Sequence, residues 1–466
     1  MMDSTCALSD AAPFIVVTPS APSLESSRKT IRSHVMRGKN RKKPPPRPAP
    51  WINKNNKATS RTHFDNHILP ITPKVGGDFS FTAAPVELGP QILTIIWKLR
   101  SIMPALEFGP NSDQDDASYL SPILNDPACF HFTFFISITY LDVIQGHTDD
   151  SVNALTHFVK ALNILQHRLA KGHLTSSTSD STILVIIGMT ITAIALDDLD
   201  TAQKHIVGLH RMVTLRGGIS AFGSNRRLQT KILRADIAMA LSTGSRTLFI
   251  ADDPTPCRSY FPPRPKQAHS NQNHKINSQK VPSGLVDFIQ ALDPRIRSTW
   301  DDLSEYCRSV NIATHCGRDI DKELYEDLMF SVHYRLLHLC YDPGTPNELM
   351  RLGLLAFASS TFLQGRGRHI SYKFLHDRFK RELSLHDTVE HTIPSSLLIW
   401  LYIIYTTSLS DEQDKKWLYP IVAELLRKNG LVSWDRIENV LKSVLWASGA
   451  HDMASRHLAE SILPLL

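Results

Sequence analysis

The stretch VNALTHFVKALNILQHRL, residues 152–169, decides the fold class that we expect. Its apolar side chains recur every three or four residues over about five helical turns, and they are Val152, Leu155, Phe158, Val159, Leu162, Leu165 and Leu169. Because an α-helix has 3.6 residues per turn, this spacing places them on one face. The stretch is therefore predicted to be an amphipathic helix that buries this face.

The same spacing recurs between residues 76 and 466. One instance comprises Ala202, Ile206, Leu209, Met212 and Val213. Segments that alternate with a period of two are scarce, and no internal repeat of fixed length is present. We therefore predict an all-α fold: a large multi-helix domain over residues 76–466, whose helices pack in an array around one or two cores.

Residues 433–449 carry the signals of one complete helix near the C-terminus. Ser433 is placed to cap its start, and Asp435 suits the first turn because of the helix dipole. Gly449 is predicted to end it. The predicted buried stripe consists of Ile437, Val440, Leu441, Val444 and Leu445.

The charge of the chain is concentrated in a short N-terminal region. The sequence has a net charge of +6, yet residues 21–60 hold eleven Lys and Arg residues against one acid, so that the rest carries −4. Residues 1–75 are also rich in Ser, Pro and Asn, and such a composition cannot bury enough apolar surface to offset the entropy of ordering. We predict a disordered basic tail over residues 1–75 and a Pro-rich, polar surface loop at about residues 252–284.

Two further features bear on the compartment. The strongest apolar runs, Ile183–Leu196 and Leu397–Tyr405, fall short of the ~20 residues that cross a bilayer, so we predict that both are buried helices. The six cysteines include no C-x₂-C pair, and residues 1–10 carry Asp3 and Asp10 where a secretory signal would be basic and then apolar. We therefore expect reduced thiols in a reducing compartment.

Three stretches in order resemble the fungal-specific transcription factor domain family. The first is RSHVMR at residues 32–37, followed by a basic run at residues 39–43. The second runs from His205 to the LRGG sequence at residues 215–218, with Arg234-Ala235-Asp236 after it. The third is C-terminal and consists of Trp417-Leu418, Ser433-Trp434, Val444-Leu445-Trp446 and His451-Asp452.

The resemblance implies a nuclear protein that regulates transcription through a helical domain, which binds protein partners or a small ligand. Most DNA-binding members carry a binuclear zinc cluster held by six cysteines. Here Cys6 is the only cysteine before residue 129, so no zinc cluster and no direct sequence-specific DNA recognition are expected. A zinc-cluster transcription factor is one expected partner. The motif residues to which the resemblance gives structural roles are His205, Gly208, Arg216, Gly217, Gly218, Trp434 and Trp446.

Residues 205–218 also have a physical interpretation of their own. The stripe of Ile206, Leu209 and Val213 is predicted to face a core, and Gly208 to permit the close approach of another helix. Arg216 suits the last helical turn, where the helix dipole favours cations, and Gly217 can adopt the left-handed cap conformation. A ligand or partner role for His205 or Arg216 is the alternative.

The basic cluster in the tail is a candidate nuclear-import signal that an import receptor would bind; its residues are Arg37, Lys39, Arg41, Lys42 and Lys43. A phosphate-contacting patch and a solvated tail without a binding role are the other interpretations. A helical interaction scaffold with no role in transcription also remains open.

Catalytic motifs are not apparent. The sequence contains no G-x-S-x-G, P-loop, H-E-x-x-H or dinucleotide fingerprint. The pairs His205/His210 and His333/His338 are five residues apart, which places each pair on different helical faces. We expect no catalytic residue, no metal and no cofactor, and therefore no enzyme.

One enzymatic alternative is a class I terpenoid synthase. The sequence DDLSE at residues 301–305 resembles the aspartate-rich magnesium motif of that family, in which carboxylates hold Mg²⁺ and a diphosphate. The sequence DDLDT at residues 197–201 begins like the second metal motif, but His205 stands at the position of its glutamate and the order is reversed. The structural interpretation is that each acidic pair lies at the start of a helix.

Overall fold

The computed structural model describes residues 123–144, 152–170, 174–250, 283–318, 320–363, 372–386 and 393–465. The contacts of the chain divide it into two units, Met1–Lys74 and Val75–Leu466, and every described residue belongs to the second. The basic cluster at residues 37–43 and nearly all of the predicted loop at 252–284 lie outside the described residues. The described part is 83% helical and contains no strand, so the all-α prediction is confirmed.

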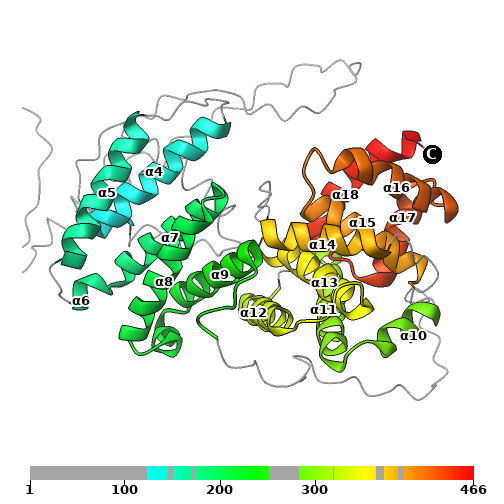
Figure 1. Cartoon of the computed structure of the whole chain (residues 1–466), viewed down its shortest axis with the longest axis horizontal. Helices are drawn as coiled ribbons and strands as arrows, with labels where there is room; N and C mark the ends of the chain where they lie inside the picture. The colour runs from blue at the N-terminus through cyan, green and yellow to red at the C-terminus, as the bar shows by residue number, and fades with distance from the viewer. Residues whose placement is uncertain are drawn as a thin grey trace, which may run out of the picture. The chain divides into compact units, whose positions relative to one another are not determined.

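The helices follow one another along the chain as Figure 1 labels them. The first group is α4 (Pro127–Ile144), α5 (Val152–Ala170), α6 (Leu174–Ser177), α7 (Asp180–Ala195), α8 (Leu199–Leu215), the 3₁₀ helix η1 (Ile219–Asn225) and α9 (Arg226–Thr243). The second group is α10 (Ser283–Ala291), α11 (Pro294–His315), α12 (Lys322–His338), α13 (Pro346–Phe362), α14 (Lys373–His386), α15 (Ser395–Ser408), α16 (Lys415–Lys428), α17 (Trp434–Val444), α18 (Ser448–Ile462) and the 3₁₀ helix η2 (Leu463–Leu465).

Neighbouring helices pack in pairs, and α9 joins the two groups. Helices α4 and α5 pack against each other, as do α7 and α8, while α7 also contacts both α4 and α9. Helix α9 then contacts α12 and α14. The buried apolar side chains form one continuous cluster from Ile123 to Ile462. The described helices therefore share a single core.

Helices α13 and α15 form the centre of this core. Nearly every residue of both helices is buried, including the ion pair of Glu348 and Arg351 on α13. They approach closely at Gly353, where an added Cβ would lie 2.5 Å from Leu401 Cδ2. Trp400 is fully buried and donates from Nε1 to the carbonyl of Leu445 at 2.6 Å, which ties α15 to the segment that links α17 and α18.

The apolar runs follow the sequence prediction. Ile183–Leu196 forms most of α7, and Leu397–Tyr405 lies within α15, whose residues are nearly all buried. None of the described helices is long and apolar enough to span a membrane.

The structure corrects in part the local predictions for α5 and for the last two α-helices. On α5, four of the seven predicted stripe residues, Val152, Leu155, Val159 and Leu169, are exposed. Leu165 is buried as predicted and Phe158 and Leu162 pack against the core, but Ala154 and Ala161 complete the buried face. Gly449 does not end a helix: α17 ends at Val444, and Gly449 lies in the first turn of α18. Ser433 occupies the N-cap of α17 and Asp435 its first turn, as predicted, but the Ser433 side chain makes no capping hydrogen bond.

The buried histidines make stability depend on pH. His451 is 3% exposed, with Nε2 2.9 Å from Ser360 Oγ, and burial lowers its pKa from 6.5 to about 4. Between these values the unfolded chain binds a proton that the folded chain does not, so the free energy of unfolding falls as the pH falls. From pH 7 to 4.5 this single group is expected to remove about 2.5 kcal/mol. Urea unfolding of the His451→Gln variant at both pH values measures the difference.

The exposed residue His457, on the same helix, provides the control. The variant His457→Gln is expected to keep the pH dependence of the parent protein, whereas His451→Gln is expected to reduce it by the contribution of His451, with His333 still contributing. Equal slopes in all three proteins would contradict the assignment.

Candidate functional site

The family-like motif at residues 205–218 forms helix α8 and its C-terminal end. Ile206, Leu209 and Val213 are at most 1% exposed, so the predicted buried stripe is confirmed. The prediction for Gly208 is wrong, because an added Cβ there would meet no atom within 4 Å. His205 is half-buried, and this burial lowers its pKa.

The end of α8 is fixed by Arg216 and the two glycines. Arg216 caps the helix, forms an ion pair with Asp180 at the start of α7 and donates to the carbonyl of Thr178 at 3.2 Å. Its guanidinium lies 4.3 Å from the centre of the Phe222 ring, which is a cation–π contact. Gly217 and Gly218 have φ angles of 100° and 85°. Through Arg216, the motif therefore connects the end of α8 to the start of α7 and to η1.

Replacing Gly217 with alanine is expected to lower the free energy of unfolding by about 1–2 kcal/mol, because an L-residue at its positive φ is strained. Gly208→Ala is the matched control. It lies inside α8 with open space around it, so alanine there is expected to stabilise the protein by about 0.5–1 kcal/mol. Chemical denaturation measures both, and destabilisation of equal size in the two variants would contradict these roles.

The two C-terminal tryptophans of the resemblance have different surroundings. Trp446 is 1% exposed and donates from Nε1 to Asp452 Oδ1 at 2.7 Å, while its carbonyl accepts from Asn311 Nδ2 at 2.8 Å. Trp434 is half-buried at the start of α17, with the Arg456 guanidinium 5.7 Å from its ring centre. Trp446 thus fixes the link between α17 and α18 to α11.

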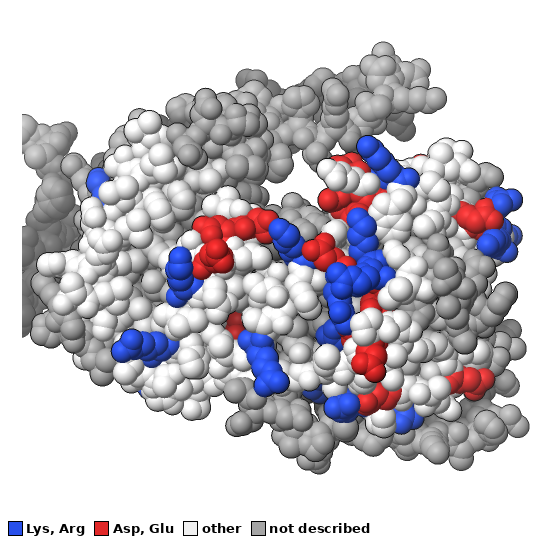
Figure 2. All heavy atoms as spheres, viewed as in Figure 1, with Lys and Arg blue, Asp and Glu red and all other residues white. Residues whose placement is uncertain are grey.

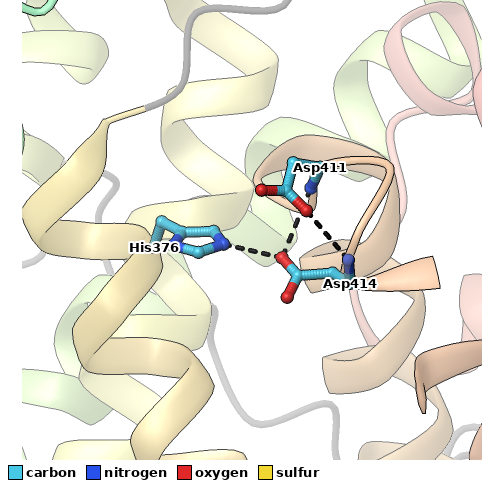
Figure 3. A group of neighbouring side chains, drawn as sticks. All are labelled: His376, Asp411 and Asp414. Carbon is cyan, nitrogen blue, oxygen red and sulfur yellow. Dashed lines mark hydrogen bonds and ion pairs between the residues drawn. The ribbon is translucent and has the colours of Figure 1, made fainter. Parts of the chain in front are cut away.

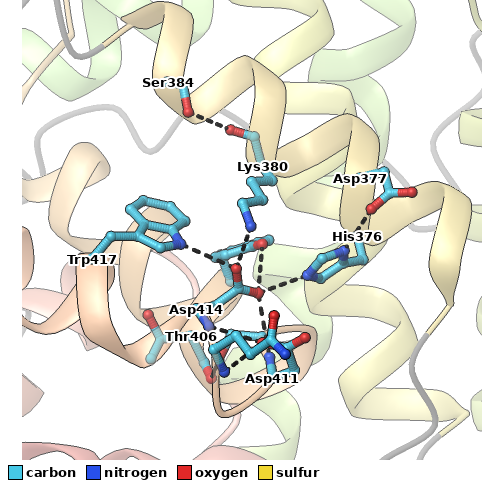
Figure 4. Close-up of polar contacts among 11 residues, drawn as sticks. His376, Asp377, Lys380, Ser384, Thr406, Asp411, Asp414 and Trp417 are labelled. Carbon is cyan, nitrogen blue, oxygen red and sulfur yellow. Dashed lines mark hydrogen bonds and ion pairs between the residues drawn. The ribbon is translucent and has the colours of Figure 1, made fainter.

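A polar cluster beside α14 centres on Asp414, which the sequence analysis did not single out (Figure 4). Asp414 lies in the turn between α15 and α16 and is 1% exposed. Its Oδ1 accepts from Lys380 Nζ at 2.5 Å and from Trp417 Nε1 at 3.0 Å. Its Oδ2 accepts from Tyr405 OH at 3.2 Å and lies 2.7 Å from His376 Nε2. One carboxylate therefore joins side chains of α14, α15 and α16.

These contacts determine the ionisation of the cluster. Burial acts to raise the pKa of Asp414, but the hydrogen bonds from Lys380, His376 and Trp417 outweigh it and hold the pKa well below its usual range. Burial and the neighbouring Asp414 raise the pKa of Tyr405. The cluster therefore holds an ionised carboxylate beside a neutral phenol.

The same cluster contains the one trio among the described residues whose ligand atoms could surround a metal ion. These are His376, Asp411 and Asp414, with atoms within 4.8 Å of one another (Figure 3). However, Asp411 Oδ1 already accepts from the backbone N–H of Asp414 at 2.8 Å, and Asp414 is neutralised by Lys380. A metal ion would have to displace the His376–Asp414 contact beside that ammonium group. The cluster is better suited to holding helices together than to binding a metal.

Two carboxylates of the synthase alternative, Asp302 and Asp198, are engaged in structure. Asp302 is fully buried and paired with Arg335, which also donates to Ser298 Oγ at 3.1 Å. It lies well inside α11, which begins at Pro294, so the prediction of a helix start is wrong there. Asp198 does begin α8 as predicted, where it accepts from the backbone N–H of Thr201 at 3.1 Å. These groups serve as an internal ion pair and a helix cap.

One small cavity lies beside the motif helix. Its volume is about 240 Å³, and its lining includes Ile206 of α8, Met239 of α9 and the buried carboxylate of Asp236. Asp236 accepts from the backbone N–H groups of Leu248 and Phe249 and from Tyr334 OH, at 2.8, 3.2 and 2.9 Å. Its hydrogen-bonding capacity is thus used to anchor the segment after α9.

Comparison with known proteins adds no relative: no family model matches the chain, and no curated protein or solved structure matches it either.

Proposed function

We propose that this chain is a nuclear regulator of transcription whose helical domain binds protein partners or a small ligand, without a zinc-cluster DNA reader of its own. The observation that carries the proposal is the α8 motif. The sequence that resembles the fungal-specific transcription factor domain there uses its apolar stripe, Arg216 and both glycines to connect α7, α8 and η1. The residues that carry the resemblance in α8 therefore hold neighbouring helices together.

The mechanism that we propose is regulation through contacts between proteins. A zinc-cluster factor would supply DNA recognition, and the helical domain would bind that factor or respond to a ligand. The polar clusters around Asp302 and Asp414 are engaged in ion pairs and hydrogen bonds, while an apolar stripe on α5 faces outward. This pattern supports a binding role more than a catalytic one.

The basic cluster gives the proposal its first test. A full-length fluorescent fusion is expected to accumulate in the nucleus, and deletion of residues 28–47 is expected to abolish that accumulation, because the import receptor loses Lys39, Arg41, Lys42 and Lys43. A second variant changes these four residues to alanine and keeps the chain length. It therefore tests whether the loss of nuclear accumulation is due to the lost charges or to the shortened chain. If the full-length fusion and the deletion fusion are both cytoplasmic, a helical interaction scaffold with no role in transcription is favoured instead.

A further inference from the structure

The cavity of about 240 Å³ beside α8 combines one buried charge with an apolar wall. The charge is that of Asp236 on α9, which is 2% exposed. The apolar wall of the cavity consists of Ile206 on α8, Met239 on α9 and Leu248 in the segment after α9. Because a dry cavity of about 150 Å³ can hold benzene, this one has room for an organic molecule of about ten non-hydrogen atoms.

The carboxylate of Asp236 has no cationic partner among the residues that the structure describes. Its three hydrogen bonds come from neutral donors, which are the backbone N–H groups of Leu248 and Phe249 and the hydroxyl of Tyr334. A carboxylate accepts about four hydrogen bonds, so one position remains on Oδ1. Burial raises the pKa of Asp236, and the nearby His210 opposes this with a smaller effect than the hydrogen bonds. A ligand cation beside Oδ1 would supply the counter-charge.

Arg246 brings an unpaired positive charge to the same cavity. Its side chain is exposed, and its guanidinium forms no ion pair or hydrogen bond with any described residue. Elsewhere on the described surface opposite charges lie side by side, as the mixed blue and red atoms over α14 and its neighbours show (Figure 2). A guanidinium binds a carboxylate through two N–H groups. Arg246 can therefore hold the anionic group of a ligand at the exposed side of the cavity.

Two uncharged polar side chains complete the lining. The amide of Gln203 on α8 has no hydrogen-bond partner among the described residues. Ser245 Oγ accepts from Thr243 Oγ1 at 2.9 Å, which leaves its own O–H group available to donate. The carbonyl oxygen of Gln203 can accept from an ammonium group, and the Ser245 hydroxyl can donate to a carboxylate.

We propose that this cavity binds a small aliphatic α-amino acid as its zwitterion. The ammonium group lies against Asp236 and the side-chain carbonyl of Gln203, the carboxylate lies against Arg246, and the aliphatic side chain lies against the apolar wall. A simple amine or a simple acid of the same size would leave one charge of the cavity unpaired. The bound molecule would join α8, α9 and the segment after α9, all of which line the cavity.

This inference gives a place and a chemical class to the small ligand of the proposed function, and its regulatory meaning rests on that proposal. Binding itself is measured on the purified protein, whereas the proposed function is tested by nuclear accumulation and reporter output. The two can therefore fail separately.

Thermal unfolding of the purified full chain with leucine, isoleucine, valine or methionine tests the proposal. At about 10 mM at least one of them is expected to raise the midpoint temperature, because a ligand that binds only the folded state stabilises it by mass action. For the amino acid that binds best, the amine and the acid that each lack one charged group are expected to bind about tenfold more weakly or worse. For leucine these are isopentylamine and isocaproate.

Two variants and a matched control locate the site. Arg246→Gln, at an exposed position, is expected to weaken binding by about tenfold, whereas Arg211→Gln, exposed on α8 but outside the cavity lining, leaves it unchanged. Asp236→Asn keeps the shape and removes the charge, and it is expected to abolish binding in a protein whose helical circular dichroism is retained. No rise with any of the four amino acids would overturn the proposal. Equal binding of the amine or the acid, or unchanged binding by Arg246→Gln, would overturn it as well.

Discussion

Replacing Asp414 with alanine is expected to lower the free energy of unfolding by about 3 kcal/mol. The buried carboxylate neutralises Lys380 and accepts from Trp417 and Tyr405, so its removal leaves a cation and several donors without their partner. Part of the effect is screened, because the Lys380 side chain is 43% exposed. Urea unfolding followed by circular dichroism measures the change.

A neighbouring acid provides the control for this experiment. Glu412 lies in the same turn, is 85% exposed and pairs with Lys415 at the surface. The variant Glu412→Ala is expected to lose less than about 1 kcal/mol. Asp414→Asn, which keeps the shape but not the charge, is expected to fall between the two. A loss for Asp414→Ala no larger than that for Glu412→Ala would contradict the role of the cluster.

The second large effect is expected at the buried pair of Asp302 and Arg335. Asp302→Ala leaves the guanidinium of Arg335, which is only 9% exposed, without its counter-charge, and we expect a loss of about 3–5 kcal/mol. The double variant Asp302→Leu/Arg335→Met removes both charges and fills the space with apolar groups. It is expected to recover most of that loss, because a buried ion pair contributes little net stability over an apolar pair.

This comparison also bears on the synthase alternative. If Asp302 served magnesium and a diphosphate, its removal would cost activity and leave the fold almost unchanged. A purely structural role for the pair predicts that Asp302→Ala lowers the free energy of unfolding. It also predicts that the double variant Asp302→Leu/Arg335→Met restores most of that stability. A single variant as stable as the parent protein would contradict that role.

The sequence predicted those parts of the fold that depend on local pattern. The stripe and positive-φ glycine of α8 follow from spacing and residue type within a short stretch. The buried helices α7 and α15 follow from their apolar composition. In α5 the same kind of pattern located the helix but misplaced part of its buried face, because the small side chains of Ala154 and Ala161 face the core. A pattern weighted toward large apolar residues does not detect such a face.

The cluster around Asp414 could not be predicted because its members come from distant parts of the chain. His376 and Lys380 lie on α14, and Trp417 lies on α16. The only local signal is the pair Asp411 and Asp414, three residues apart in a turn, where the first carboxylate accepts backbone N–H groups. Such a signal identifies a turn and gives no information about the cations that complete the cluster.

The central claim, that this chain regulates transcription through its helical domain, is tested most directly at a promoter. The full-length chain is fused to an unrelated DNA-binding domain that recruits it upstream of a reporter gene, and reporter output is compared with that of the DNA-binding domain alone. We predict a reproducible change in output for the fusion, and a smaller change for the Asp302→Ala variant, in which the domain is destabilised. Reporter output indistinguishable from the control, with the fusion present in the nucleus at equal abundance, would contradict the claim and favour a scaffold without a transcriptional role.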